Sequence, residues 1–292
     1  QPMKGPTGLI FAMKSNYADG TSSTAPTEAL FNEPNTSFSG KMSTATAEGS
    51  TFAEMGFSIE KSTVTAESRQ LKANYTMELA QDLKAVHGLN AESELASILS
   101  TEILGEINRE MIQTMNTAAV PGANFDAAVG GSSGGRWEVE IYKNLITHID
   151  KEANAIAIAT RRGKGNFAII SSNVAAALNA TGNVQYGNTA NVSLADVTGN
   201  LFVGTLNGGI KLYVDPFATS DYVTVGYKGT NSYDAGIFYC PYVPLSMMKT
   251  VGENDFQPRI GFKTRYGMTA NPFTSNAADS NVYYRTFTIT NL

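Results

Sequence analysis

The residues best suited to acid–base or nucleophilic chemistry are few in this 292-residue chain: His87, His148 and Cys240. A catalytic histidine or cysteine needs a matched partner within hydrogen-bond reach, and neither histidine belongs to an HxxxH or similar zinc-binding pattern. Cys240 lies in the apolar run GIFYCPY, which favours a buried, unreactive thiol. A hydrolase that uses Cys240 with one histidine is therefore an alternative that the sequence does not favour. We expect no enzyme activity, no catalytic residue and no metal site.

Two glycine-containing segments approach the patterns of nucleotide-binding loops but lack their context. Residues 163–168 read G-x-G-x-x-A, yet they precede an apolar strand pattern, whereas a dinucleotide site joins a strand to a helix. Gly204 and Gly209 have the spacing of a P-loop, but Ile210 and Lys211 follow them in place of Lys and Ser or Thr. The sequence therefore predicts no cofactor.

Positive charge gathers at Arg161, Arg162 and Lys164. These cations could contact a phosphate group or an acidic patch on another subunit. They also stand where a predicted helix ends, and cations with a following Gly163 stabilise a helix C-terminus. The structural role at the helix end is the favoured interpretation.

A second group of cations alternates along one predicted strand, at Arg259, Lys263 and Arg265. Side chains at this spacing share one face of a strand. Such a face suits the inner surface of an assembly or acidic side chains across an interface, and the sequence leaves both open.

The overall composition favours protein–protein contacts over nucleic-acid binding. Charged residues make up 16% of the chain and the net charge is −5, whereas a dedicated nucleic-acid binder carries a strong basic excess. One cysteine excludes an intrachain disulfide, and no apolar run is long enough for a membrane helix. We expect no membrane association.

Residues 1–54 predict an extended arm. They are rich in Ser, Thr, Ala and Gly and are interrupted by proline, yet they contain scattered apolar residues, among them Phe31 and Phe38. A disordered tail is usually poorer in such residues, so we expect them to pack elsewhere on this chain or on a neighbour. A mobile leader is the alternative.

Hydrophobic spacing predicts the next elements: a strand-like segment over 57–75, a helix over 77–87, and a long helix capped by Asn90. The apolar side of the long helix is expected to change around residues 103–105. The residues on its first side are Leu95, Ile98, Leu99 and Ile103, and those on the reverse side are Leu104, Ile107, Met111 and Met115. This pattern is typical of a helix that crosses two packing layers.

The second half of the chain predicts one strong helix and a series of strands. Residues 118–135 resemble a flexible linker, and a helix follows over 137–160 with the stripe Trp137, Ile141, Leu145, Ile149, Ala153, Ile156 and Thr160. A strand at 167–171, a helix at 173–180 and strands at 201–205, 210–214, 222–227, 236–242, 259–268 and 282–290 come next. The sequence therefore predicts an α+β fold around a mostly antiparallel sheet.

Several separated segments together resemble one known family. They are GPTGLIFAMKS, MGFSIEK, SRQLKANYTMELAQDLKAVHGLNAESELASILSTEI, IDKEAN, RRGKGNFAIISSNV, YVTVGYKG, DAGIFYCPYVPL, FQPRIGFKTRYGM and NPF. In this order they resemble the major capsid proteins of T-even-like tailed phages, which have an HK97-like fold. The stretch between Tyr17 and Phe52 is short, whereas well-known members of that family carry an inserted domain there.

The resemblance implies an HK97-like α+β fold with an N-terminal arm, an E-loop, a peripheral domain with a long spine helix, and an axial domain. The implied division is an arm and E-loop region without the insertion (1–54), the E-loop return strand, peripheral sheet and spine helix (55–119), a Gly-rich linker (120–135), the axial domain (136–250) and a return to the peripheral domain (251–292). Gln1 in place of methionine fits either a processed chain or part of a longer one.

The resemblance also implies a function: hexameric capsomers of an icosahedral or prolate phage head that encloses double-stranded DNA without sequence-specific binding. The related pentameric vertex protein is the alternative. Implied partners are further copies of this chain, the vertex protein, a transient scaffold and prohead protease, and decoration proteins, all within the virion shell. As candidate assembly contacts we name Phe31, Phe38, Arg161, Arg162 and Lys164.

Overall fold

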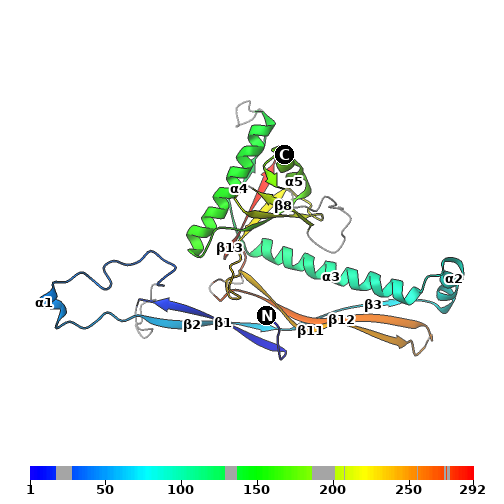
Figure 1. Ribbon diagram of the computed structural model, residues 1–292. Coiled ribbons are helices and arrows are strands. Elements are labelled where there is room, and N and C mark those ends of the chain that lie inside the picture. Colours follow the sequence, from blue (N-terminus) through cyan, green and yellow to red (C-terminus); the bar gives the residue numbers. More distant parts are fainter. Residues whose placement is uncertain are drawn as a thin grey trace.

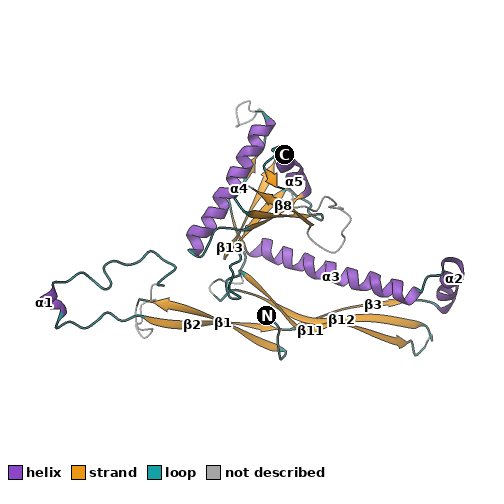
Figure 2. Cartoon of the chain, viewed as in Figure 1, coloured by secondary structure: helices purple, strands orange, loops and turns teal. Residues whose placement is uncertain are grey.

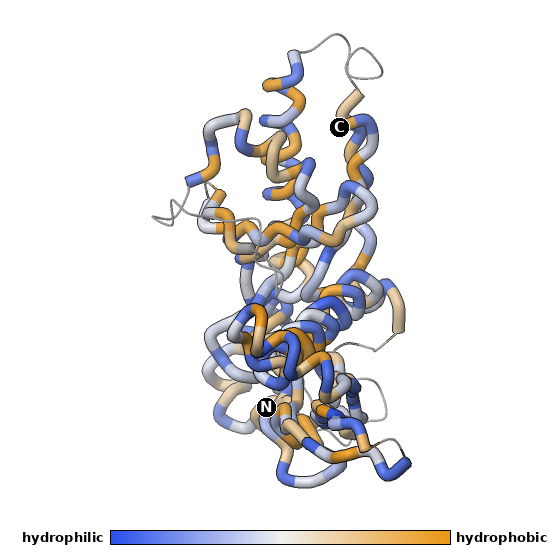
Figure 3. The backbone as a smooth tube through the Cα atoms, turned by 90° about the vertical axis from the view of Figure 1, so that its right-hand side faces the viewer, coloured by the Kyte–Doolittle hydropathy of each residue, from blue (hydrophilic) through white to orange (hydrophobic). Residues whose placement is uncertain are grey.

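The computed structural model describes residues 1–17, 28–128, 137–185, 201–206, 208–254, 256–272, 274 and 277–292. Helix α4 (Glu138–Thr160) stands in an upper part, and helix α3 (Ala91–Ala118) runs along a lower part (Figure 1). The upper part holds the C-terminus and the lower part holds the N-terminus, as the view turned by 90° also shows (Figure 3).

The upper part is built on an eight-stranded sheet. Its order is β4 (Ala119–Pro121), β13 (Asn281–Thr290), β10 (Tyr222–Gly226), β6 (Phe167–Ser171), β9 (Ile210–Asp215), β8 (Leu201–Leu206) and β7 (Val184–Gln185), and β5 (Phe125–Asp126) also pairs with β13. The β6–β9, β13–β4 and β13–β5 pairs are parallel and the others antiparallel, so the sheet is mixed. The predicted strands of this region are confirmed, as is the β8–β9 hairpin, where Gly208 and Gly209 take the positive φ that a tight turn needs.

The main core lies between this sheet and two helices, α4 and α5 (Ser172–Ala180). The predicted stripe of α4 is confirmed from Ile141 onward, because those side chains are buried against the sheet. Trp137 is the exception: it precedes the helix as its N-cap and is exposed. The helix end also differs, since Arg161 and not Gly163 takes the left-handed conformation.

The lower part is a three-stranded antiparallel sheet in the order β11 (Ile237–Val251), β12 (Pro258–Ala270) and β3 (Glu67–Asn74). Helix α3 covers one face of it, as Figure 2 shows, and the short helix α2 (Met77–His87) ends at the left-handed Gly88. Asn90 caps α3 as predicted, because its Oδ1 accepts a hydrogen bond from the Glu92 amide at 3.1 Å.

Helix α3 does contact two layers, but it changes sides later than predicted. Leu99 and Ile103 pack on the lower sheet, and Ile107 and Met111 extend the same cluster. A stripe at every fourth residue drifts by only about 40° per step around a helix, so it stays on one sheet for several turns. The predicted change at residues 103–105 is therefore wrong.

The change of side falls at Ile112 and Met115. Ile112 packs with Ile169 and Tyr222 of the upper sheet, and Met115 contacts the same cluster. Ile98 and Leu104, which the sequence placed in the two stripes, are both exposed. The C-terminal end of α3 thus covers the upper sheet on the face opposite α4.

A long hairpin projects from the lower part. Strands β1 (Thr7–Asn16) and β2 (Gly56–Thr65) pair residue for residue over their whole length, and α1 (Thr44–Ala47) lies at the far end of the loop between them (Figure 1). Part of the predicted extended arm is therefore a regular strand.

The strands are shared between the two sheets in a way that differs from the predicted domain bounds. Strand β11, which the sequence placed in the axial domain, pairs in the lower sheet, and β13 pairs in the upper sheet. Residues 119–121 and 125–126, predicted as linker, are strands β4 and β5. Residues 129–135 of that predicted linker lie outside the described part.

Candidate assembly interfaces

The residues suited to acid–base or nucleophilic chemistry lie on three different elements. His87 ends α2, His148 belongs to α4, and Cys240 lies on β11. Burial beside the rings of Phe125 and Phe287, at 5.7 Å and 4.6 Å between centroids, lowers the pKa of His148. Burial raises the pKa of the Cys240 thiol, whose exposed fraction is 1%. These surroundings keep His148 neutral and the thiol protonated, which suits packing.

Within the described ranges, no group of three or more His, Cys, Asp or Glu side chains is placed to hold a metal ion. No helix in the same part of the chain combines the length and the apolar character that crossing a membrane requires.

The glycine of the nucleotide-like segment has a packing role. A Cβ atom on Gly163 would lie 2.4 Å from the ring of Tyr227. Glycine is therefore required there by the approach of an aromatic ring, and the segment leads from α4 into β6.

One face of the β1–β2 hairpin is apolar and exposed. The register places Leu9, Phe11 and Met13 on the same side as Phe57 and Ile59, and all five side chains are exposed. We call these five residues the hairpin's apolar face. Exposed contiguous apolar groups of this kind mark contacts with another molecule.

The opposite face of the hairpin is buried within the chain. Ile10 and Val64 pack with Phe238 and Cys240 of β11. Ser62 Oγ and Thr269 Oγ1 are 2.8 Å apart, which ties β2 to β12. The hairpin base is thus fixed to the outer side of the lower sheet, while its apolar face has no cover from the described residues.

The loop beyond the hairpin is apolar and acidic. Phe52 is 91% exposed, and Met42 and Met55 are exposed as well. Residues 32–55 contain Glu33, Glu48 and Glu54 against the single cation Lys41. The candidate Phe38 packs on Tyr17, with 5.0 Å between ring centroids, so it helps to shape the loop.

The outer face of the lower sheet carries positive charge. Arg259, Lys263 and Arg265 share the side of β12 that faces away from α3, and Lys72 joins them from β3, opposite Gly261. The remaining register neighbours on β3 are Ser68, Gln70 and Asn74, so these two strands present no carboxylate on this face. We call these four cations the basic sheet face.

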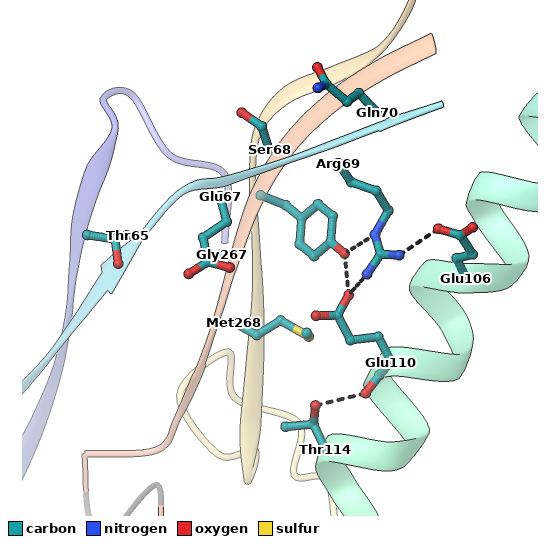
Figure 4. A pocket seen from close by; sticks show the side chains of 11 residues that line it. Thr65, Glu67, Ser68, Arg69, Gln70, Glu106, Glu110, Thr114, Gly267 and Met268 are labelled. Carbon is teal, nitrogen blue, oxygen red and sulfur yellow. Dashed lines mark hydrogen bonds and ion pairs between the residues drawn. The ribbon is translucent and has the colours of Figure 1, made fainter. Parts of the chain in front are cut away.

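The inner face of the same sheet is braced against α3 around a polar cavity of about 630 Å³ (Figure 4). Arg69 Nη1 contacts Glu106 at 2.6 Å, and its Nη2 contacts Glu110. Arg69 Nε donates to Tyr266 Oη at 2.9 Å, and that hydroxyl donates to Glu110. These contacts of Arg69 and Tyr266 with Glu106 and Glu110 hold the sheet and the helix together.

The candidate cations separate into different roles. Arg162 lies with its guanidinium 3.8 Å from the ring centre of Phe31, so two candidates from distant parts of the chain meet. Lys164 Nζ pairs with Asp150 at 2.5 Å, and Arg161 is exposed. The apolar run at residues 9–13 was visible in the sequence, but because Ile10 and Ala12 are apolar too, the run does not show which side of the strand is exposed.

The fold matches those of known phage capsids. A capsid structure of Myoviridae Phage XM1 matches 97% of this chain and 84% of its own, with 12% identity and a TM-score of 0.53. The Cyanophage P-SCSP1u capsid matches 100% and 86%, with 9% identity and a TM-score of 0.53. A structure of Mycobacterium phage Bobi gives a TM-score of 0.55 at 10% identity, over 100% of this chain and 88% of that one. The fold is thus an α+β capsid fold of the HK97-like class.

Sequence relatives identify one family within this fold class. The family model described as Major capsid protein Gp23 matches residues 1–51 and 41–289. The major capsid protein of Serratia phage KSP90 is 38% identical, over 100% of this chain and 80% of the relative, and that of Salmonella phage ViI is 40% identical, over 97% and 75%. The chain belongs to this family of T4-like major capsid proteins, whose place is the capsid shell of the virion.

The phage T4 proteins separate the two candidate roles. The T4 major capsid protein is 46% identical over 78% of this chain, which spans about half of that relative (47%). The T4 capsid vertex protein is 31% identical over 81% of this chain. The major capsid role is therefore favoured over the vertex role.

Proposed function

We propose that this chain forms hexameric capsomers by head-to-tail contacts and that the capsomers build an icosahedral or prolate head around double-stranded DNA. The observation that carries the proposal is the projecting hairpin with its exposed apolar face. A subunit that extends one surface outward and offers a different surface elsewhere makes heterologous contacts, which form a ring when the rotation between successive copies closes.

The docking surface for the loop is assigned from charge. The loop residues 32–55 hold three carboxylates and one cation, and the basic sheet face holds four cations without a carboxylate on β3 or β12. Opposite potentials at two separate surfaces of one subunit favour contact between copies and fix its orientation. The acidic loop of one copy therefore docks on the basic sheet face of the next.

The proposed domains follow the sheets. The lower sheet with α2 and α3 is the peripheral domain, the upper sheet with α4 and α5 is the axial domain, and residues 7–65 are the E-loop. Family membership supports the remaining partners, which are the vertex protein, a scaffold, a prohead protease and decoration proteins. The chain acts as a structural protein in this proposal and not as an enzyme.

Replacing residues 32–54 with a short Gly-Ser linker tests the proposal. Deleting all of residues 1–54 would also remove β1, whose Ile10 is buried, so the linker variant is the sharper choice. Electron microscopy of the concentrated wild-type protein is expected to show shells, tubes or sixfold rings, and the linker variant is expected to remain a folded monomer. Wild-type protein that stays monomeric, or normal shells from the variant, would contradict the proposal.

The vertex alternative has its own test. The hexamer-forming protein should dominate a denaturing gel of purified virions, because hexamers far outnumber vertices in a shell. A minor band would favour the vertex role.

A further inference from the structure

The root of the E-loop is the segment 28–31, which returns to the end of β1. Glu28 forms an isolated bridge with Asn16, and the Ala29 amide donates to Ser15 O at 2.7 Å. Ala29 is buried, which fixes the root on the hairpin. From this point the chain continues toward the loop tip.

The root contains a strained residue. Leu30 has a φ of 75° and is 80% exposed. A positive φ is unfavourable for a bulky side chain, and it persists only where the surroundings hold the backbone in place. Contacts next to Leu30 must therefore hold the backbone in this conformation.

Arg162 supplies that constraint. Its guanidinium lies 3.8 Å from the ring centre of Phe31, Nη2 is 3.4 Å from Glu28 Oε1, and Nη1 is 4.0 Å from Asp234 Oδ1. The side chains of Arg162, Glu28 and Asp234 are all mostly buried. Stacking and ion pairing on both sides of Leu30 thus hold the root against the axial domain.

Arg162 is itself held in position. It follows the end of α4, and Tyr227 Oη donates to its carbonyl oxygen at 3.2 Å. Asp234 accepts from the hydroxyls of Tyr227 and Tyr283 at 3.1 Å and 3.3 Å. The cluster is therefore a rigid point on the upper part, to which the base of a projecting loop is attached.

We propose that Arg162 is a positioning residue for assembly, which fixes the direction of the E-loop before it docks on another copy. The inference rests on the proposed function, because direction matters only if the loop docks. Arg162 contacts its own chain and orders the loop in advance, so docking loses less conformational entropy.

The test compares Arg162→Ala with Arg161→Ala, which removes the same charge from the neighbouring exposed position, and with Arg162→Lys. Hydrogen–deuterium exchange of peptides covering residues 28–35 should become roughly tenfold faster in Arg162→Ala, because the root opens locally. Arg161→Ala should match the wild type. Arg162→Lys, which keeps the charge but loses the planar stacking group, should lie between them.

Assembly provides the second readout. Shell formation followed by light scattering should slow in Arg162→Ala and proceed normally in Arg161→Ala, while thermal unfolding confirms that both variants are folded. Unchanged exchange at residues 28–35 in Arg162→Ala would overturn the inference, as would an equal effect of Arg161→Ala. If the wild type forms no shells, the proposed function fails, whereas the exchange measurement still decides whether Arg162 holds the loop root.

Discussion

Arg109 Nη1 on α3 lies 2.6 Å from Asp215 Oδ2 at the end of β9, and this ion pair joins the lower and upper parts of the subunit. The Asp215 side chain is fully buried (0% exposed). It also accepts hydrogen bonds from Tyr222 Oη at 2.6 Å and from the Phe217 amide at 3.0 Å. The carboxylate thus has three partners, and through Arg109 it links α3 to the upper sheet.

Removing Arg109 should destabilise the fold. Arg109→Met leaves a buried carboxylate without its countercharge, so we expect a loss of about 2–4 kcal/mol in the free energy of unfolding, measured by chemical denaturation. Adding Asp215→Asn to this variant should recover at least part of the loss, because no unpaired charge then remains. A single variant within about 0.5 kcal/mol of the wild type would show that the pair contributes little.

Stability should fall at alkaline pH. Burial, together with the hydrogen bond to Asp215, raises the pKa of Tyr222 to about 12, from its ordinary value near 10. Below pH 10 the tyrosine is protonated in both states, so its contribution is complete. Between pH 10 and 12 only the unfolded state loses the proton, and stability should fall by about 1.4 kcal/mol per pH unit from this residue. Denaturation curves of wild type and Tyr222→Phe across this range measure the slope, which should be shallower in the variant.

The hairpin's apolar face should matter for assembly and not for folding. Changing Leu9, Phe11 and Met13 together to Ser removes exposed apolar groups, so we expect the free energy of unfolding to change little and shells to disappear in electron micrographs. The matched control is Ile10→Ser on the buried face of the same strand, which should destabilise the fold by roughly 2–4 kcal/mol. Normal shells from the triple variant would exclude this face as a contact.

Charge exchange should identify the docking surface. Lys72→Glu with Lys263→Glu reverses part of the basic sheet face and should prevent assembly, and Glu48→Lys with Glu54→Lys should prevent it as well. Mixing the two variants should restore shells, because the reversed surfaces complement each other between copies. If mixing restores nothing while the reversed sheet face abolishes binding to a DNA duplex, the face contacts nucleic acid instead.

Gly163 should not tolerate a side chain. The Tyr227 ring occupies the space that a Cβ atom would need, and that ring belongs to the packed Arg162 cluster. Gly163→Ala should therefore cost about 1–3 kcal/mol. The measurement is thermal unfolding, with Gly49→Ala as a control, since a Cβ at Gly49 meets no atom within 4 Å.

The helices and most strands could be predicted because their patterns are local. The α4 stripe and the Asn90 cap follow from residues a few positions apart. The division between domains could not, because β11 and β13 pair in different sheets through contacts that no local pattern encodes. The short strands β4 and β5 were missed because Gly-rich flanking sequence resembles a linker.

The contacts within the candidate site could not be predicted either, because they join residues that are far apart in the sequence. Phe31 and Arg162 were each selected separately, but nothing in their local sequence indicates that they stack on one another. The apolar residues of the arm were expected to pack elsewhere, and the continuous apolar run at residues 9–13 does not tell which of its side chains are exposed. Only the register of β1 against β2 shows which side is left uncovered.

The unbroken pairing of β1 with β2 has a geometric consequence. Ten paired residues extend about 33 Å, so each copy would reach its neighbour at a distance set by strand length alone. Inserting two residues in each strand keeps every side chain on its face and lengthens the reach by about 7 Å. Shells of altered curvature or diameter from such a variant, measured by electron microscopy, would show that the hairpin sets the spacing of the lattice.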